Sequence, residues 1–199
     1  MRDVALAKAA VCPIDFINRR AIIHNQNNNP SEFLVENLHL LPKGKVLDVA
    51  MGGGRNAVYL ASKGFQVEGV DNSLEAVNKA LKLAEEKKVE ITTHFVDLES
   101  DLFIKEETYD VIICFNFLQR SLIPYIKKGL RPGGMIVYET YIVDQAQFGR
   151  PANPDYLLKH NELLDFFRDY RCLRYHEGII ETGRAVAGII TRKGEKENA

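Results

Sequence analysis

The sequence predicts an α/β protein with a doubly wound, mostly parallel sheet, and three observations support this fold class. Short apolar segments that suit strands alternate with amphipathic segments that suit helices, as in consecutive β–α–β units. A glycine-rich stretch, DVAMGGGRN at 48–56, joins the first such strand to the next helix. Near the carboxyl end, only ETGR separates two strand-like segments, so we expect them to pair antiparallel as a hairpin.

The composition fits one globular domain. The chain has 199 residues, 46% of them apolar, which is enough to bury a substantial core. The net charge is -1 and no basic block stands out, so we expect no binding to nucleic acid. We expect no membrane span, and Lys8 interrupts the short apolar start, which makes a poor signal peptide. Three widely separated cysteines indicate reduced thiols in a cytoplasmic protein and no metal site.

The elements follow one another in a regular order. An N-terminal extension over 1–30 precedes a domain over 31–193 and a polar tail over 194–199. The first helix is expected over 29–41, with Asn29 as its cap and Pro30 in its first turn. Strands are then expected at 45–50, 65–71, 89–97, 109–115 and 135–141, with RPGG as a turn before the last of them. Helices are expected at 55–63, 73–88 and 122–130, closed by Gly64 and capped by Ser73 and Ser121 respectively.

The carboxyl-terminal part departs from this order. The stretch 147–158 reads as an irregular insertion and 160–169 as a short helix. Strands at 170–180 and 185–193 form the expected hairpin.

The glycine-rich stretch has the pattern of a ligand-binding loop. Gly52, Gly54 and Ala57 match G-x-G-x-x-[GA] between a strand and a helix, although a plain strand-to-helix turn has the same pattern by chance. Open α/β sheets bind ligands beyond the carboxyl ends of their strands, where this loop would lie. The absence of Gly-Lys-Ser/Thr argues against a P-loop. A carboxylate at Asp48 would repel the pyrophosphate of a dinucleotide but would attract a cation.

These features favour S-adenosylmethionine, which carries an ammonium and a sulfonium and no phosphate. Aspartates end three successive strands: Asp48, Asp71 and Asp97. Asp71 follows the loop by about 20 residues, where an acid accepts hydrogen bonds from ribose hydroxyls. Asp97 is placed to accept from an adenine amino group. Each aspartate alone would fit a turn or a helix cap, but three in succession favour ligand contacts.

The motifs LDVAMGGGRNAVYLASKGFQVEGVDNS, VDLE, YDVIICF and LRPGGMIVYET resemble, in order, those of class I S-adenosylmethionine-dependent methyltransferases. The Gly-Arg-Asn opening of the helix looks most like the tellurite-resistance and thiopurine-type small-molecule enzymes. In the first motif Ala50 replaces the family's first glycine. The resemblance implies a Rossmann-like seven-stranded sheet with an antiparallel last strand, and by analogy residues 1–30 would be a lid.

The resemblance also implies the residues that contact the methyl donor, whose product is S-adenosylhomocysteine. They are Asp48, Ala50, Gly52, Gly54, Arg55, Asn56, Asp71, Asn72, Asp97, Leu98, Phe115 and Asn116.

The acceptor is expected to be a small molecule. The chain lacks Asp/Asn-Pro-Pro-Tyr, the Pro-Cys nucleophile and any extra domain that nucleic-acid methyltransferases use. A thiolate or a reduced chalcogen oxyanion needs little help from a base, whereas an amine or a hydroxyl needs one. The candidate acceptor residues are Arg120, in the loop 116–120, Arg150 and Tyr141. The alternative for both arginines is a surface position or an ion pair that pins a loop.

Two rival functions stay open from the sequence. A nicotinamide-dependent oxidoreductase shares the glycine loop and Asp71, but Asp48 and the terminal hairpin argue against it. A non-enzymatic module that binds S-adenosylmethionine also fits, because no catalytic base stands out. The sequence does not decide between a monomer and a homodimer.

Overall fold

The computed structural model describes residues 28–98 and 103–195. Most of the expected extension or lid, with Cys12 and His24, lies outside the described residues, as does most of the polar tail. Everything below concerns the described part of the chain.

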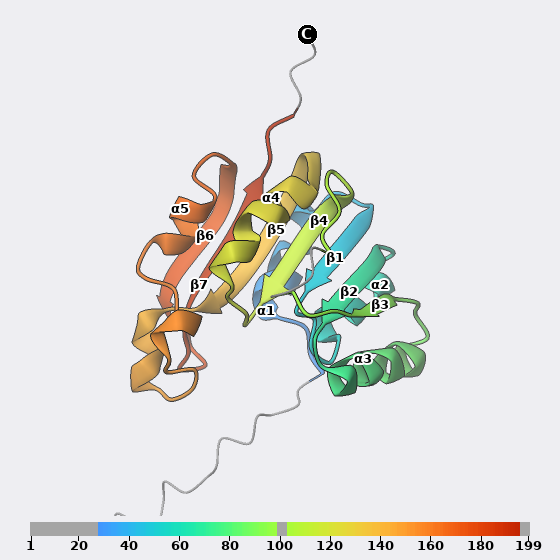
Figure 1. Ribbon diagram of the computed structural model, residues 1–199, viewed down its shortest axis with the longest axis horizontal. Coiled ribbons are helices and arrows are strands. Elements are labelled where there is room, and N and C mark those ends of the chain that lie inside the picture. Colours follow the sequence, from blue (N-terminus) through green and yellow to red (C-terminus); the bar gives the residue numbers. More distant parts are fainter. Residues whose placement is uncertain (1–27, 99–102, 196–199) are drawn as a thin grey trace, which may run out of the picture.

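A seven-stranded sheet, ordered β3-β2-β1-β4-β5-β7-β6, forms the centre of the molecule (Figure 1). The parallel strands are β1 (Lys45–Val49), β2 (Gln66–Asp71), β3 (Thr92–Phe95), β4 (Tyr109–Phe115) and β5 (Leu130–Tyr141). The hairpin consists of β6 (Arg171–Ile179) and β7 (Ala185–Arg192), and β7 runs antiparallel to both β5 and β6. The predicted fold class and the terminal hairpin are therefore confirmed.

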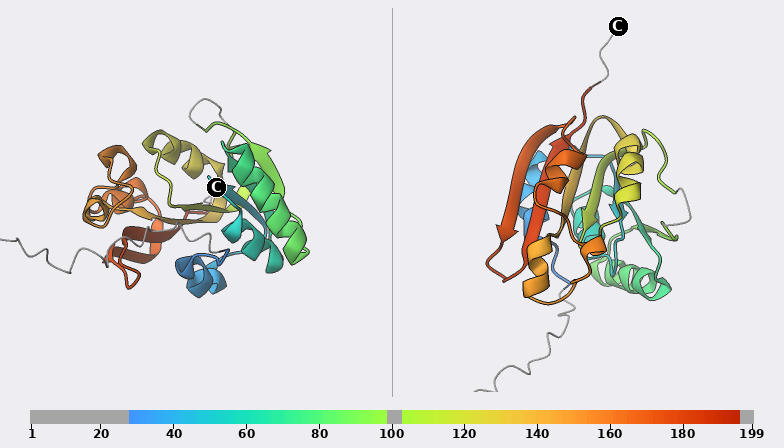
Figure 2. Two further views of the ribbon diagram at one scale, coloured as in Figure 1. Left: turned by 90° about the horizontal axis from the view of Figure 1, so that it is seen from below. Right: turned by 60° about the vertical axis from the view of Figure 1, so that its left-hand side comes forward.

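Helices cover both faces of the sheet (Figure 2). One face carries α4 (Ile123–Gly129) and α5 (Glu162–Phe166), and the other carries α1 (Glu32–Asn37), α2 (Arg55–Ser62) and α3 (Leu74–Lys87). Short 3₁₀ turns extend α1 (η2, Leu38–Leu40), precede α4 (η3, Arg120–Leu122) and shape the insertion after β5 (η4, Val143–Gln147; η5, Pro154–Tyr156).

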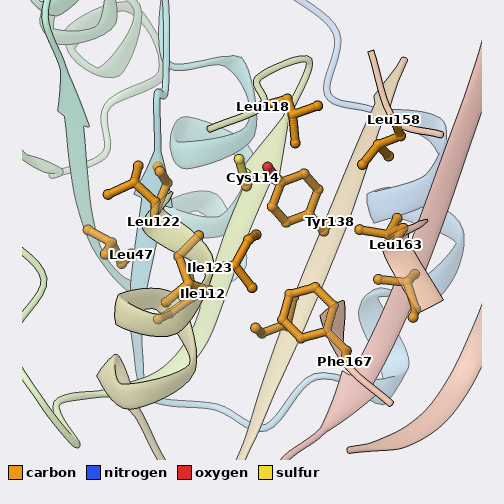
Figure 3. Packing of buried hydrophobic residues seen from close by; sticks show 14 of the residues in the cluster. Leu47, Ile112, Cys114, Leu118, Leu122, Ile123, Tyr138, Leu158, Leu163 and Phe167 are labelled. Carbon is orange, nitrogen blue, oxygen red and sulfur yellow. The ribbon is translucent and has the colours of Figure 1, made fainter. Parts of the chain in front are cut away.

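The core has two layers because side chains alternate across the strands. Leu47, Ile112 and Tyr138 point toward α4 and α5, where they pack with Ile123 and Phe167 (Figure 3). The intervening residues of the same strands pack against α1 and α2: Val46, Val111 and Val137. Burying each such side chain contributes about 1.5–3 kcal/mol, so central strands that are apolar on both faces are expected here.

The first helix begins later than the sequence predicted. It starts at Glu32 with Ser31 as the N-cap residue, and Asn29 lies outside it. The backbone N–H of Ser31 donates to Oδ1 of Asn56 at 2.9 Å, so the segment before α1 runs along α2. Ser31 and Asn56 are far apart in the sequence, so no local sequence pattern predicts this contact.

Other boundaries also differ from the prediction. RPGG lies within β5, where a register shift opposite Tyr109 and Val111 accommodates it. β3 has only four residues. Ser121 is inside η3 and is not the cap of α4, although Pro124 lies in the first turn as expected. Asn161 adopts a left-handed conformation, φ +63°, so α5 starts only at Glu162.

Gly54 provides a test of how α2 is held against α3. Its φ is +76°, and a Cβ there would lie 2.5 Å from Cβ of Ala80. Gly64 is a matched control, because its φ is +83° and nothing lies within 4 Å of its added Cβ. Both alanine variants should lose about 1–2 kcal/mol to the left-handed conformation, and Gly54→Ala should lose more because of the clash. Equal losses in urea unfolding would contradict this account of the loop.

Candidate functional site

The candidate site lies at the carboxyl ends of β1, β2 and β4, on the lower side of the sheet in Figure 1. The strand order reverses between β1 and β4, and open α/β sheets bind ligands at such a point. Two cavities, of about 250 and about 270 Å³, meet there, because Ala50, Phe115 and Asn116 line both.

The structure brings most of the predicted donor-site residues together. The first cavity is lined by Asp71, Asn72, Asp97 and Leu98, besides the three shared residues. The second is lined by Asp48, Gly52, Arg55 and Asn56. Gly54 lines neither cavity, because it is buried under α3. That these residues bind a methyl donor stays a prediction.

The loop between β1 and α2 follows an unusual backbone path. Ala50, Gly52 and Gly54 have φ values of +54°, +55° and +76°. A non-glycine residue with a positive φ of this size is strained. The backbone at Ala50 therefore explains why the family motif has a glycine at this position. Asn116, which also lines both cavities, has φ +56°. Two non-glycine residues that line both cavities, Ala50 and Asn116, therefore have a left-handed backbone conformation.

Asp71 fixes the loop next to the first cavity. Its Oδ2 accepts a hydrogen bond from the N–H of Gly52 at 2.8 Å, and its Oδ1 accepts one from the N–H of Ser73 at 2.9 Å. Each carboxylate oxygen has a second lone pair. Asp71 can therefore hold the loop and also accept from a ligand.

Asp48 is the most unusual group in the site. Its side chain is 2% exposed, and Oδ2 has no hydrogen-bond partner among the described residues. Burial raises the pKa of Asp48 to about 8, and the nearby positive charge of Arg55 only partly opposes this. Arg55 itself has a lowered pKa, because of its burial and the nearby charge of Arg184. A buried carboxyl group with one unpaired oxygen is costly unless a ligand partners it.

Several lining residues were not predicted from the sequence. Phe117 and Gln119 line the first cavity, and Nε2 of Gln119 donates to the carbonyl of Leu98 at 3.4 Å. Their place in the loop 116–120 was a usable signal. Lys79 lines the second cavity from the middle of α3, and a position inside a helix gives no such signal.

Arg120 forms an ion pair that holds a loop in place, which is the alternative role that the sequence left open for this residue. Its Nε and Nη2 donate to the two carboxylate oxygens of Glu162 at 2.7 and 2.8 Å. Nη1 and Nη2 also donate to the carbonyls of Asp155 and Leu157, both at 2.9 Å. This pairing holds the pKa of Glu162 below its usual range. Arg120 therefore ties the insertion to α5, and it lines neither cavity.

The two other acceptor candidates lie at the same edge. Arg150 is exposed in the insertion, and the structure gives its side chain no hydrogen bond within the described residues. Tyr141 ends β5 near Arg55. That these residues bind an acceptor stays a prediction.

The rest of the described chain offers no competing site of clear chemistry. Within residues 28–98 and 103–195, no group of three or more His, Cys, Asp or Glu side chains is arranged to hold a metal. Among the helices described there, none is long and apolar enough to cross a membrane. A larger depression of about 1060 Å³ lies at the amino ends of β1, β2 and β3, away from the ligand edge.

Asp48→Asn should remove a pH dependence of stability. The pKa of Asp48 is about 8 in the folded chain and 3.8 ordinarily. Between these values the unfolded chain has lost a proton that the folded chain keeps, so stability should fall as pH rises, by up to about 1.4 kcal/mol per pH unit. In urea unfolding from pH 5 to 8, the stability of Asp48→Asn relative to the wild type should increase with pH. A constant difference between the two proteins would contradict the raised pKa.

Comparisons with known proteins show which family this chain resembles. The model of the family described as tellurite resistance protein TehB matches residues 20–188. The probable S-adenosyl-L-methionine-dependent methyltransferase TehB of Haemophilus influenzae is 24% identical, over 90% of this chain and 65% of its own length. The ubiquinone biosynthesis O-methyltransferase of Rickettsia akari is 31% identical, over 60% of this chain and 51% of its own. The chain thus spans about half to two thirds of these relatives.

A solved structure agrees with these matches. The crystal structure of TehB from Haemophilus influenzae superposes with a TM-score of 0.68 and 26% identity, covering 80% of this chain and 61% of that one. The resemblance to the tellurite-resistance type is confirmed. Because the family model matches most of its length, this chain belongs to the TehB family of tellurite resistance proteins.

Proposed function

We propose that this protein transfers a methyl group from S-adenosylmethionine to a small-molecule acceptor. The observation that carries the proposal is Asp48, a buried carboxyl group with an unpaired oxygen, in the wall of a cavity that Arg55 and Lys79 also line. The amino-acid end of S-adenosylmethionine has an ammonium and a carboxylate. A site with one acidic and two basic side chains therefore matches both the ammonium and the carboxylate of this ligand.

The electrostatics favour this donor over a dinucleotide. A unit charge 4 Å from an ionised Asp48 would interact by about 4 kcal/mol at an effective dielectric constant of 20. That energy is favourable for an ammonium and unfavourable for a pyrophosphate. Ionised Asp48 is disfavoured without a cation because its pKa is raised to about 8. The names of the relatives from Haemophilus influenzae and Rickettsia akari agree with a methyltransferase.

The first cavity suits the nucleoside half. Leu98 and Phe115 offer apolar walls for the adenine ring, and Asp71 offers carboxylate oxygens for the ribose hydroxyls. Asp97, an exposed residue that follows β3, lines the same cavity. Polar groups that are few and precisely placed within an apolar lining are typical of small-molecule sites.

When bound, S-adenosylmethionine supplies a methyl group on a sulfonium, which is transferred by in-line displacement. This chain's contribution is to hold both reactants in near-attack geometry, which lowers the barrier without covalent help. Phe115 and Asn116, at the end of β4, would exclude water where the two cavities meet. We propose a thiol or a chalcogen oxyanion as the acceptor, because both are soft nucleophiles. We place the reaction in the cytosol, since Cys114 and Cys172 are free thiols.

Calorimetric titration with S-adenosylmethionine, S-adenosylhomocysteine and NAD tests the proposal against its oxidoreductase rival. The wild type should bind the first two, and Asp71→Asn should weaken binding by about 1.5–3 kcal/mol because the ribose loses a charged acceptor. The asparagine keeps one of the two oxygens that accept from the loop, so one of the two loop hydrogen bonds is also lost. Asp169→Asn, an exposed carboxylate paired with Lys127 far from the site, is the matched control and should change nothing. Micromolar binding of NAD without binding of S-adenosylmethionine would end the proposal.

A further inference from the structure

Glu139, near the end of β5, is a second buried carboxylate that the proposed donor site does not use. Its residue is 5% exposed, yet its described contacts are long. Oγ of Ser31 lies 3.5 Å from Oε1, and Nε2 of His176 lies 3.4 Å from Oε2. In the described part of the chain, no lysine or arginine forms a salt bridge with this carboxylate. A buried carboxylate with such weak partners is expensive to keep for stability alone.

The sheet register explains how His176 reaches Glu139. The two residues are on β6 and β5, which are separated by β7, and Gly188 of β7 is the register partner of both. The ring of His176 lies over Gly188, where an added Cβ would be 2.3 Å from its Cε1. The glycine therefore leaves room for the imidazole to cross a strand.

Glu139 lies beside the proposed donor site, although neither it nor His176 lines either cavity. The N–H of Asn116, whose residue lines both cavities, donates to the carbonyl of Glu139 at 2.9 Å. Ser31, which contacts the Glu139 carboxylate, donates its N–H to Asn56, a residue of the second cavity. The negative charge of Glu139 also acts on Arg55 of the same cavity, where it opposes the lowering of the pKa of Arg55 by burial. Phe33 covers His176 with its ring edge-on, at 4.7 Å between centroids.

Two other histidine–carboxylate pairs show what a structural pair looks like in this protein. Glu68 lies 2.9 Å from His94 and also binds Lys45 at 2.8 Å, at the far end of the sheet. His160 and Asp144 form a 2.9 Å contact on the surface of the insertion. The Glu139–His176 pair resembles Glu68–His94 in burial, with a buried carboxylate and a partly exposed imidazole. It differs from that pair in lying at the ligand edge, and no lysine or arginine among the described residues forms a salt bridge with Glu139 as Lys45 does with Glu68.

We infer that His176 is the proton acceptor of the acceptor site, that Glu139 is its positioning residue, and that the acceptor is a thiol or a hydroxyl whose nucleophilic atom carries a proton. The inference rests on the proposed function. A carboxylate beside Nε2 favours the tautomer with a proton on that nitrogen, which leaves Nδ1 as the base. The acceptor's heteroatom bonds to the methyl carbon, the carbon–sulfur bond breaks with its electron pair going to sulfur, and the acceptor's proton moves to Nδ1.

Three probe acceptors separate this role from a structural one. They are 2-mercaptoethanol, catechol and selenite, and selenium in selenite attacks through a lone pair that carries no proton. The wild type should methylate at least one of the first two. His176→Gln, Glu139→Gln and Gly188→Ala should each lower that rate, by about 10²–10⁴-fold for the histidine variant, as expected for loss of a general base. Any rate with selenite, and the affinity for S-adenosylmethionine, should stay within about twofold of the wild type.

His160→Gln, which removes the exposed pair in the insertion, is the matched control and should leave all rates unchanged. Equal losses with protic and oxyanion probes would assign Glu139 and His176 a structural role and overturn the inference. Methylation of selenite alone by the wild type would also overturn it, while leaving the proposed function intact. No transfer to any probe would count against the proposed function and would remove this inference with it.

Discussion

The burial of one carboxyl group, that of Asp48, is the constraint on which the ligand edge depends. Asp48 is next to the last residue of β1, a strand that is covered on both faces, so its side chain is removed from water and the pKa rises to about 8. The loop that follows must turn back at once toward α2, and Ala50 and Gly52 do so only with positive φ values. Both the unpaired oxygen and the strained backbone cost stability, and a cationic ligand would offset the first of these costs.

The same edge is closed by residues from distant parts of the chain. Ser31 links α2 to β5 through Asn56 and Glu139. Arg120 links the loop after β4 to the insertion through the carbonyls of Asp155 and Leu157, and to α5 through Glu162. The two cavities therefore lie between the ends of the strands and segments that only tertiary contacts hold in place. In our account the strand ends bind the methyl donor, and the other segments, with His176, receive the acceptor. Membership of the TehB family is consistent with this division, because proteins of one fold family can use the same methyl donor with different acceptors.

Sequence patterns predicted the parts of the structure that depend on local order. Strand and helix alternation, the glycine loop and the aspartates at strand ends are all readable from neighbours along the chain. The role of Arg120 was not decidable, because its partners are some 35–42 residues away. Ser31 was missed as the cap of α1 because its amide is bound by Asn56. The pairing of Glu139 with His176 required the register of three strands, which no single segment specifies.

Proton release on ligand binding tests the central claim most directly. If Asp48 is protonated in the free protein at pH 7 and ionises beside a bound cation, S-adenosylmethionine should release close to one proton on binding. Calorimetry at pH 7 in buffers of different ionisation enthalpy measures this number. The account predicts a release that approaches one proton for the wild type and falls to near zero for Asp48→Asn. Tight binding to the wild type with no proton released would contradict it.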